Sequence, residues 1–266
     1  MLSEEMTGRL VNEIRRFLIA DAATLSKAND EQLRRRIADI VDHKLVNYRI
    51  SPQERSRIVR LVFSSIRGMG ILDEILADDS ITEITCHAKG AHYLNPNVRT
   101  VIDIGGQDIK AISIDENGAV KNFLMNDKCA AGTGRFLEMM ARTLGLSLEE
   151  MSTKGLEWKE NIVISSMCTV FAESEVVSLV AQNKDVADII HGLNVSVASK
   201  VGALAARLGQ NNPGEYMMTG GVAQNQGIVE ALEEKLGAKL YICDEAQLCG
   251  ALGAALFAYE KCQAAK

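Results

Sequence analysis

The sequence predicts an α-helical N-terminal subdomain followed by an α/β fold. Glycine separates the two parts, because Gly8, Gly68 and Gly70 precede residue 85 and the other eighteen glycines follow it. Before residue 85, apolar side chains recur at helical spacing. After it, short apolar runs alternate with amphipathic segments, as in helices packed on a sheet. We therefore expect a helical subdomain over residues 1–84 and an α/β lobe over residues 85–266.

Length and charge narrow the classes of function. With 266 residues, 47% of them hydrophobic, the chain can bury a sizeable core. A formal net charge of -6 argues against nucleic acid or an anionic membrane as the partner. The first ten residues lack the apolar stretch of a secretory signal, and no apolar run reaches the length of a membrane span. We expect a cytoplasmic protein.

The helical subdomain is predicted from apolar spacing and from start signals. Asn29 can cap a helix together with Gln32. Ser51, Pro52 and Glu54 form a strong start signal, with an N-cap serine, a proline in the first helical position and a glutamate that closes a capping box. The four predicted helices carry residues 10–18, 33–41, 58–63 and 71–76.

The α/β lobe is predicted from alternating apolar runs and turn signals. The predicted strands cover residues 99–103, 109–114, 119–124, 162–165, 216–219 and 239–242. The predicted helices cover residues 135–144, 172–182, 186–208, 225–236 and 248–259, and Ser147 with Glu150 caps one more.

The first glycine motif lies between the first two strands. Asp103 ends a strand, and Gly105 and Gly106 form the turn that follows. Glycine lets backbone N–H groups approach a phosphate closely. Asp103 could orient a magnesium ion through water, and Gln107 is a candidate for positioning the attacking water. The alternative is an ordinary β-hairpin turn, which this motif alone would favour.

A second glycine motif joins a strand to a helix near the C-terminus. Gly220 and Gly221 precede this helix, and Gln224 lies at its start, which suits an anion or a ribose. The alternative is a tight connection needed only for packing. A third motif, GALGAA from Gly250, gives one helix a face of small residues, for which we expect close helix packing.

The order of these motifs favours the nucleotide interpretation. A DxGG turn, a TGGV turn roughly a hundred residues later and a final GALGAAL helix follow one another. They resemble the second phosphate loop, adenosine loop and second connecting helix of the actin, sugar-kinase and heat-shock-protein ATPase superfamily. The resemblance implies an actin-like (ribonuclease H-like) ATPase lobe.

Two cysteines precede predicted helices. The six cysteines are too scattered for a disulfide framework, so buried or metal-ligating roles are expected. Cys129 and Cys168 each lie before a helix, whose N-terminus lowers a thiol pKa and favours an anion such as an iron–sulfur cluster with its thiolates. Two cysteines cannot complete a four-thiolate site, whereas a homodimer supplies four. The alternative is two buried cysteines beside glycine-rich turns.

Five segments together resemble one family. They are NDKCAAGTGRF, SSMCTVFAESEV, TVIDIGGQD, MTGGVAQN and GALGAALFAY, and the similarity extends from residue 86 to about 261. They resemble the activator component of 2-hydroxyacyl-CoA dehydratases, of the 2-hydroxyglutaryl-CoA dehydratase type, and the related ATPase subunits of benzoyl-CoA reductases.

This resemblance implies cofactors, partners and site residues. It implies a homodimer that binds ATP or ADP with Mg²⁺ and holds one bridging 4Fe–4S cluster. Cys129 and Cys168 match the ligand positions, and Gly132 and Gly134 join the predicted nucleotide-binding residues. ATP binding and hydrolysis would drive one low-potential electron into a separate dehydratase.

Residues 1–84 depart from this family. The family begins with a strand and a phosphate loop of the form GIDxGSxxxK, which the sequence does not contain. Instead, RRRIADIVDHKLV and GMGILDEILADDSITEI resemble the helical N-terminal region of secretion and pilus ATPases, which implies a fusion. In an actin-like fold the nucleotide binds between two lobes. Without the first lobe we therefore expect weakened ATP hydrolysis.

Three functions therefore stay open. The first is an ATP-dependent electron-transfer activator of a dehydratase. The second is a non-catalytic iron–sulfur homodimer or nucleotide-binding module. The third is an assembly module of a secretion system, in which the second part of the chain serves only as a scaffold.

Overall fold

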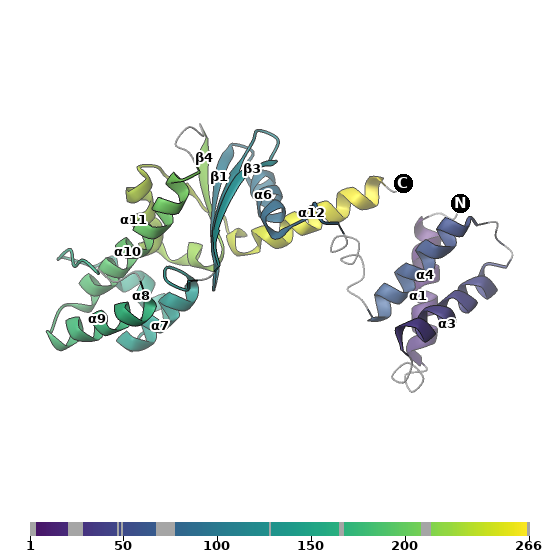
Figure 1. The fold of residues 1–266 in the computed structure, drawn as a ribbon, viewed down its shortest axis with the longest axis horizontal. Coiled ribbons are helices and arrows are strands. Elements are labelled where there is room, and N and C mark those ends of the chain that lie inside the picture. Colours follow the sequence, from purple (N-terminus) through teal and green to yellow (C-terminus); the bar gives the residue numbers. More distant parts are fainter. Residues whose placement is uncertain are drawn as a thin grey trace. The chain divides into compact units, whose positions relative to one another are not determined.

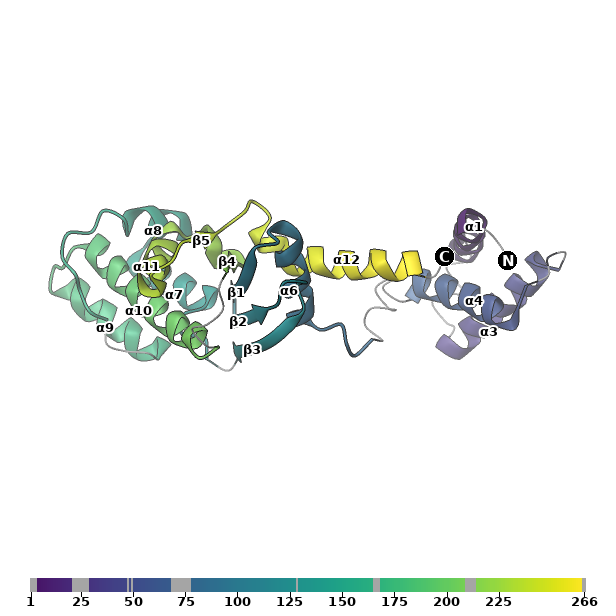
Figure 2. The same cartoon turned by 90° about the horizontal axis from the view of Figure 1, so that it is seen from above.

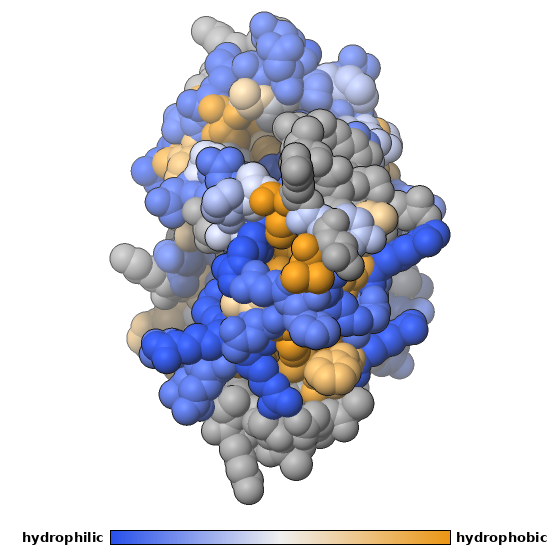
Figure 3. Space-filling model, turned by 90° about the vertical axis from the view of Figure 1, so that its right-hand side faces the viewer, coloured by the Kyte–Doolittle hydropathy of each residue, from blue (hydrophilic) through white to orange (hydrophobic). Residues whose placement is uncertain are grey.

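The computed structural model describes residues 4–20, 29–46, 48, 50–67, 78–127, 129–164, 168–208 and 214–264. Contacts divide the chain into a helical unit, Met1–Asp79, and an α/β unit, Ser80–Lys266. The boundary expected after residue 84 falls inside helix α6, Glu83–Leu94. The assignment of separate domains stays a prediction. Figure 3 shows one face of the molecule, where hydrophilic residues surround small hydrophobic areas.

Three helices form the described part of the helical unit: α1 (Glu4–Ala20), α3 (Asp30–Lys44) and α4 (Pro52–Arg67). Asn29 and Gln32 form the expected reciprocal capping box, and Ser51 Oγ accepts the Glu54 N–H at 3.1 Å. The core consists of Ile14, Leu18, Leu33, Ile37, Val41, Leu45, Ile58, Val62 and Phe63. Phe17, one of the apolar residues at helical spacing within residues 10–18, is exposed. The short helix expected at 71–76 lies outside the described residues.

The α/β unit is built on a five-stranded sheet of order β3-β2-β1-β4-β5. The strands are β1 (Val98–Ile104), β2 (Ile109–Ile114), β3 (Val120–Asn126), β4 (Glu215–Thr219) and β5 (Leu240–Tyr241). β2 runs antiparallel to β1 and β3, whereas β1, β4 and β5 run parallel. The β1–β4 register places Asp103 opposite Thr219. Both residues therefore lie at the same end of the sheet, beside the two glycine turns.

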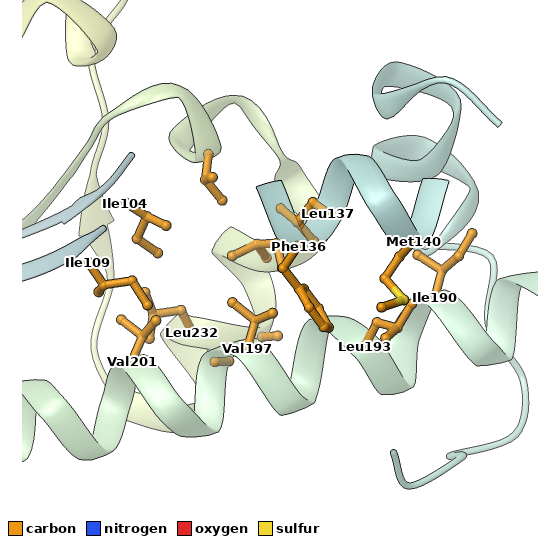
Figure 4. Packing of buried hydrophobic residues seen from close by; sticks show 14 of the residues in the cluster. Ile104, Ile109, Phe136, Leu137, Met140, Ile190, Leu193, Val197, Val201 and Leu232 are labelled. Atoms are coloured by element: carbon orange, nitrogen blue, oxygen red, sulfur yellow. The ribbon is translucent and has the colours of Figure 1, made fainter. Parts of the chain in front are cut away.

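Helices cover both faces of this sheet (Figures 1 and 2). The helices of this unit are α6, α7 (Gly134–Leu144), α8 (Leu148–Lys154), α9 (Thr169–Ala181), α10 (Val186–Ala206), α11 (Gln226–Leu236) and α12 (Cys249–Ala264). Ile104 and Ile109 face α7, α10 and α11, as Figure 4 shows. Val101 and Ile112 point to the other face, toward α6 and α12, because side chains alternate along a strand.

One helix and one strand differ from expectation. α6 was not predicted, although Thr82 and Thr85 form its capping box. The strand expected at 162–165 is wrong for the described residues 162–164, which have no strand pairing. Ile162 and Ile164 are buried against α10 instead, while Val163 is exposed. The approach to α10 is close, since a Cβ on Gly192 would lie 2.4 Å from the Ile162 carbonyl oxygen. Short apolar runs do not reveal whether a sheet or a helix buries them.

Helix α10 is the one helix in the described ranges that is long and apolar enough to cross a membrane. More than half of its apolar stretch is buried inside the protein. Ile190, Leu193, Val197 and Val201 point from α10 into the core (Figure 4). The burial matches that of a core helix.

Glycines allow α6 and α12 to cross closely. A Cβ on Gly253 would lie 1.8 Å from the Cys86 carbonyl oxygen, and one on Gly90 would lie 2.1 Å from that of Cys249. These contacts confirm close packing as the role of the GALGAA segment. Two buried cysteines line the crossing, and burial raises the pKa of Cys249 to about 12.

Gly253→Ala is expected to lower the stability of the α/β unit by about 1–3 kcal/mol, because the new methyl group meets rigid backbone. This cost exceeds the gain in helix propensity of about 1 kcal/mol. Gly8→Ala in α1 is the control, since nothing lies within 4 Å of its Cβ position, and it should stabilise the helical unit. Urea unfolding measures both, and an unchanged α/β transition in Gly253→Ala would contradict the close crossing.

Candidate functional site

The first glycine turn is held against the start of α7. The Gly105 N–H donates to the Asp108 carbonyl at 3.0 Å, which closes the turn. The N–H groups of Gly134 and Arg135 donate to the carbonyls of Gly105 and Gly106 at 2.9 and 2.8 Å. A Cβ on Gly134 would lie 3.2 Å from the Gly106 Cα, so this contact requires glycine. These two N–H groups of α7 therefore fix the turn and are not free for a ligand.

Asp103 lies buried beneath this turn. One carboxylate oxygen accepts the Thr219 hydroxyl at 2.8 Å, and the other accepts Lys110 Nζ at 3.2 Å. His87 Nδ1, on α6, lies 3.5 Å from the first oxygen. Both oxygens of Asp103 are thus engaged within the protein.

Lys110 is almost completely buried and is surrounded by carboxylates. Its Nζ lies 2.5 Å from Asp108, 2.9 Å from Glu83 and 3.2 Å from Asp103. Burial disfavours the ammonium, but the hydrogen bonds to Asp108 and Glu83 and the charge of Asp103 raise the pKa of Lys110 well above its ordinary value. Lys110 therefore offsets part of the negative charge beside the turn and links α6 to it.

A cleft of about 750 Å³ opens above the turn. The turn, α7, α8, the 3-10 helix η1 (Gly221–Gln224) and the start of α11 form its walls. Its lining residues are Gly105, Gly106, Gly134, Leu137, Glu138, Leu148, Glu149, Ser152, Thr153, Gly221, Val222, Gln224, Asn225, Gln226 and Gln247. The volume is that of a small-molecule or cofactor site.

Five predicted nucleotide-binding residues meet in this cleft, namely Gly105, Gly106, Gly134, Gly221 and Gln224. The other four, Asp103, Gln107, Gly132 and Gly220, do not line it.

Two of those four act through the backbone. Gly220 has φ 86°, and a Cβ there would lie 2.4 Å from the Ile104 carbonyl oxygen, so glycine lets the end of β4 lie against β1. Gly132 also has φ 86° and packs beside Lys200 and Ile109.

Sequence reasoning missed the wall formed by α8. Glu149, Ser152 and Thr153 line the cleft from this helix, and the Gln226 N–H donates to Ser152 Oγ at 3.1 Å. The capping box of Ser147 and Glu150 predicts α8 correctly. No local signal indicates that α8 lies against the start of α11, because the two meet only through tertiary packing.

Both predicted cluster ligands are exposed, free cysteines. Cys168 is the N-cap residue of α9, and its side chain makes no capping bond. Cys129 lies in the loop before α7, four residues ahead of its N-cap, Thr133. Burial beside the glycine-rich turns, the alternative weighed for both, does not occur.

Helix α10 borders the Cys129 loop and the segment that ends at Ile164. Lys200 Nζ of α10 lies 3.7 Å from Cys129 Sγ. A groove along α10 includes both Lys200 and Ile164, which lies four residues before Cys168. The helices that follow the cysteines, α7 and α9, pack together, and Thr143 Oγ1 lies 3.3 Å from Glu173 Oε1.

The loop that leads toward Cys168 is fixed to the start of α10. Asp188 accepts the N–H groups of Lys159 and Glu160 at 2.6 and 2.9 Å. Trp158 stacks on His191 at 3.8 Å between ring centroids, and burial lowers the pKa of His191. These contacts fix residues 158–160 to the start of α10.

The described residues of one chain do not provide a complete set of metal ligands. Over the described ranges, no group of three or more His, Cys, Asp or Glu side chains could hold a metal ion. The outer face of α9, beside Cys168, is apolar and exposed at Val170, Phe171, Val177 and Val180. A four-thiolate site would therefore need a second chain, and α9 offers an apolar surface beside it.

This sheet order, with a cleft formed by two glycine turns, defines the actin-like ATPase fold predicted from the sequence. The sequence profile of the BadF/BadG/BcrA/BcrD ATPase family matches residues 9–258, so the chain belongs to this family. Within it, the chain is a member of the 2-hydroxyacyl-CoA dehydratase activator ATPases. The match includes most of the helical unit, whose resemblance to secretion ATPases stays a prediction.

Individual relatives are similar over most of the chain. The (R)-2-hydroxyglutaryl-CoA dehydratase activating ATPase of Acidaminococcus fermentans is 53% identical over 188 residues, 71% of each chain. The 2-hydroxyisocaproyl-CoA dehydratase activator of Clostridioides difficile is 46% identical over 197 residues, 74% of this chain and 73% of the relative.

Two solved structures are also similar. Component A of the Acidaminococcus fermentans dehydratase has a TM-score of 0.68 at 44% identity, covering 82% of this chain and 87% of that one. The activator of the Clostridium difficile 2-hydroxyisocaproyl-CoA dehydratase, with bound ADPNP, has a TM-score of 0.67 at 39% identity, covering 81% and 84%.

Proposed function

We propose that this protein is an ATP-dependent iron–sulfur activator that transfers an electron to a 2-hydroxyacyl-CoA dehydratase. The observation that carries the proposal is the cleft that joins both glycine turns, in a unit that also presents two exposed, unpaired cysteines. Relatives at 46–53% identity are activators of such dehydratases.

The two walls of the cleft differ in a way that suits the two ends of a nucleotide. Gly105 and Gly106 would face the phosphates, where small residues allow close backbone approach. Gly221 and Gln224 would contact the ribose or base on the opposite wall. Glu138 and Glu149 also line the cleft, and their carboxylates suit sugar hydroxyls better than phosphates. ADPNP bound to a relative at 39% identity supports this assignment.

Asp103 and Gln107 are proposed on the phosphate side. Asp103 would act on a Mg²⁺ ion through water, and Gln107 would orient the attacking water. Because both oxygens of Asp103 are already engaged by Thr219 and Lys110, Asp103 also holds the turn in place.

The cysteines fit a shared 4Fe–4S cluster in a homodimer. Cys129 and Cys168 are free and exposed, and two chains would supply four thiolates. The exposed apolar face of α9 would be covered by the second copy. The cluster would serve as a one-electron carrier. The positive N-terminal end of the α9 dipole would lie at Cys168, the N-cap residue of that helix.

A second candidate is a nucleotide-binding iron–sulfur homodimer without hydrolysis. The engagement of both Asp103 oxygens favours it, because that carboxylate does not face the cleft. The two candidates share the cysteine site and differ in turnover of ATP.

Anaerobic reconstitution with iron and sulfide tests both candidates. The proposal expects a dimer with about two irons per chain, from four irons shared by two chains. After reduction, ATP with Mg²⁺ and a 2-hydroxyacyl-CoA dehydratase should oxidise the cluster, whereas ADP should not. An iron-loaded dimer without ATP turnover would support the second candidate. A colourless, iron-free monomer would exclude both.

A further inference from the structure

Lys200 is held beside Cys129 by two contacts. Its Nζ lies 3.7 Å from Cys129 Sγ, within hydrogen-bonding range of a sulfur, and donates to the Ala131 carbonyl in the same loop. The aliphatic stem packs against Gly132, where a Cβ would lie 3.5 Å from Lys200 Cδ. The loop that carries Cys129 therefore also holds the Lys200 ammonium beside the thiol.

The ammonium has no competing carboxylate in the part of the chain that the structure describes. Lys110, Lys184 and Lys239 each pair with an acidic side chain, whereas the polar contacts of Lys200 are the sulfur and one carbonyl oxygen. No neighbouring carboxylate among the described residues therefore offsets its positive charge beside Cys129. A lysine that served only as a solvent-exposed polar residue on α10 would need neither contact.

We propose that Lys200 raises the reduction potential of the iron–sulfur cluster, as a positioning residue that donates a hydrogen bond to the Cys129 thiolate. The inference rests on the proposed function, since it needs a cluster at Cys129. Reduction adds one electron to the cluster and its thiolates, and a nearby positive charge and an N–H···S bond stabilise the reduced form more than the oxidised form. A homodimer brings two such lysines to one cluster.

The expected effect is large enough to measure. Without Lys200, the equilibrium constant for one-electron reduction should fall about tenfold, which is a potential lower by about 59 mV. A purely structural role, in which Lys200 only orders the loop, predicts lower iron occupancy with an unchanged potential in the molecules that keep the cluster.

The test uses the full chain reconstituted anaerobically, with iron content and an EPR-monitored redox titration as readouts. Lys200→Met removes the charge and the donors, Lys200→Gln keeps only donors, and Lys200→Arg keeps both. The control is Lys235→Met, since the Lys235 stem packs on Gly202 much as the Lys200 stem packs on Gly132. We expect a lower potential for Lys200→Met, a smaller shift for Lys200→Gln and wild-type values for Lys200→Arg and the control.

Each other outcome has a defined meaning. Full iron content with an unshifted potential in Lys200→Met overturns the inference and leaves the proposed function standing. Loss of iron in both Lys200→Met and Lys200→Gln also overturns it, because the role is then structural. A wild-type protein that takes up no iron contradicts the proposed function itself.

Discussion

Replacing Cys129 or Cys168 with alanine is expected to reduce the iron content from about two irons per chain to background. Each chain is proposed to donate two thiolates, so one substitution removes two of the four ligands of a shared cluster. The described residues contain no third metal-ligating group beside either cysteine that could replace it. Iron analysis after anaerobic reconstitution measures the effect, and the mass of the assembly reports the loss of the dimer.

The folds of these two variants should be unaffected. Both cysteines are exposed, and the Cys168 side chain makes no capping bond that alanine would remove. Surface substitutions of this kind change stability by about 0.5 kcal/mol or less. The matched control is Cys262→Ala in α12, which should keep full iron content. Retention of iron in either Cys129→Ala or Cys168→Ala would refute the proposed ligand pair.

Much of the fold is predictable because local signals and packing agree. The sequence predicts β2 over residues 109–114, as observed, and Asn29, Ser51 and Ser147 mark three helix starts. Helix α6 escapes prediction because its buried face consists of small residues such as Ala88, Gly90 and Ala91. These residues suit a close crossing with α12, which lies far away in the chain and gives no local periodicity.

The candidate site is predictable only in part. Glycine turns can be recognised from the sequence because paired glycines are uncommon within helices and strands. Five of the nine predicted nucleotide-binding residues line the cleft. Gly220 was expected to bind a ligand, but its positive φ and its contact with β1 explain the glycine without one. The α8 wall depends on contacts such as Ser152 with Gln226, which link residues 74 positions apart. Long-range contacts of this kind have no signature in a single sequence.

Lys110→Met is expected to destabilise the α/β unit by about 3–5 kcal/mol. Methionine fills a similar volume but leaves the buried carboxylate of Asp103 without its cation, and uncompensated buried charge carries a cost of this size. Urea unfolding measures the change. Trp158, the single tryptophan, lies in the α/β unit, so its fluorescence reports that transition apart from the helical unit.

The pH range of this effect follows from the direction of the pKa shift. A lysine whose pKa is raised by folding contributes stability that is fully present below the unfolded-state pKa of about 10.4. That contribution is lost only as pH rises through the still higher folded-state pKa. The difference between wild type and Lys110→Met should therefore stay constant from pH 7 to pH 9.

A double substitution separates lost charge compensation from simple loss of packing. If the cost arises from the unpaired Asp103 carboxylate, Lys110→Met with Asp103→Asn should be more stable than Lys110→Met alone, because no buried charge is left there. If lost packing dominates, adding Asp103→Asn should lower stability further, since the hydrogen bond from Thr219 to a carboxylate is weakened. Lys121→Met on the exposed face of β3 is the control and should change stability by about 0.5 kcal/mol or less. A loss in Lys110→Met as small as in Lys121→Met would mean that the buried ion pairs do not hold the glycine turn.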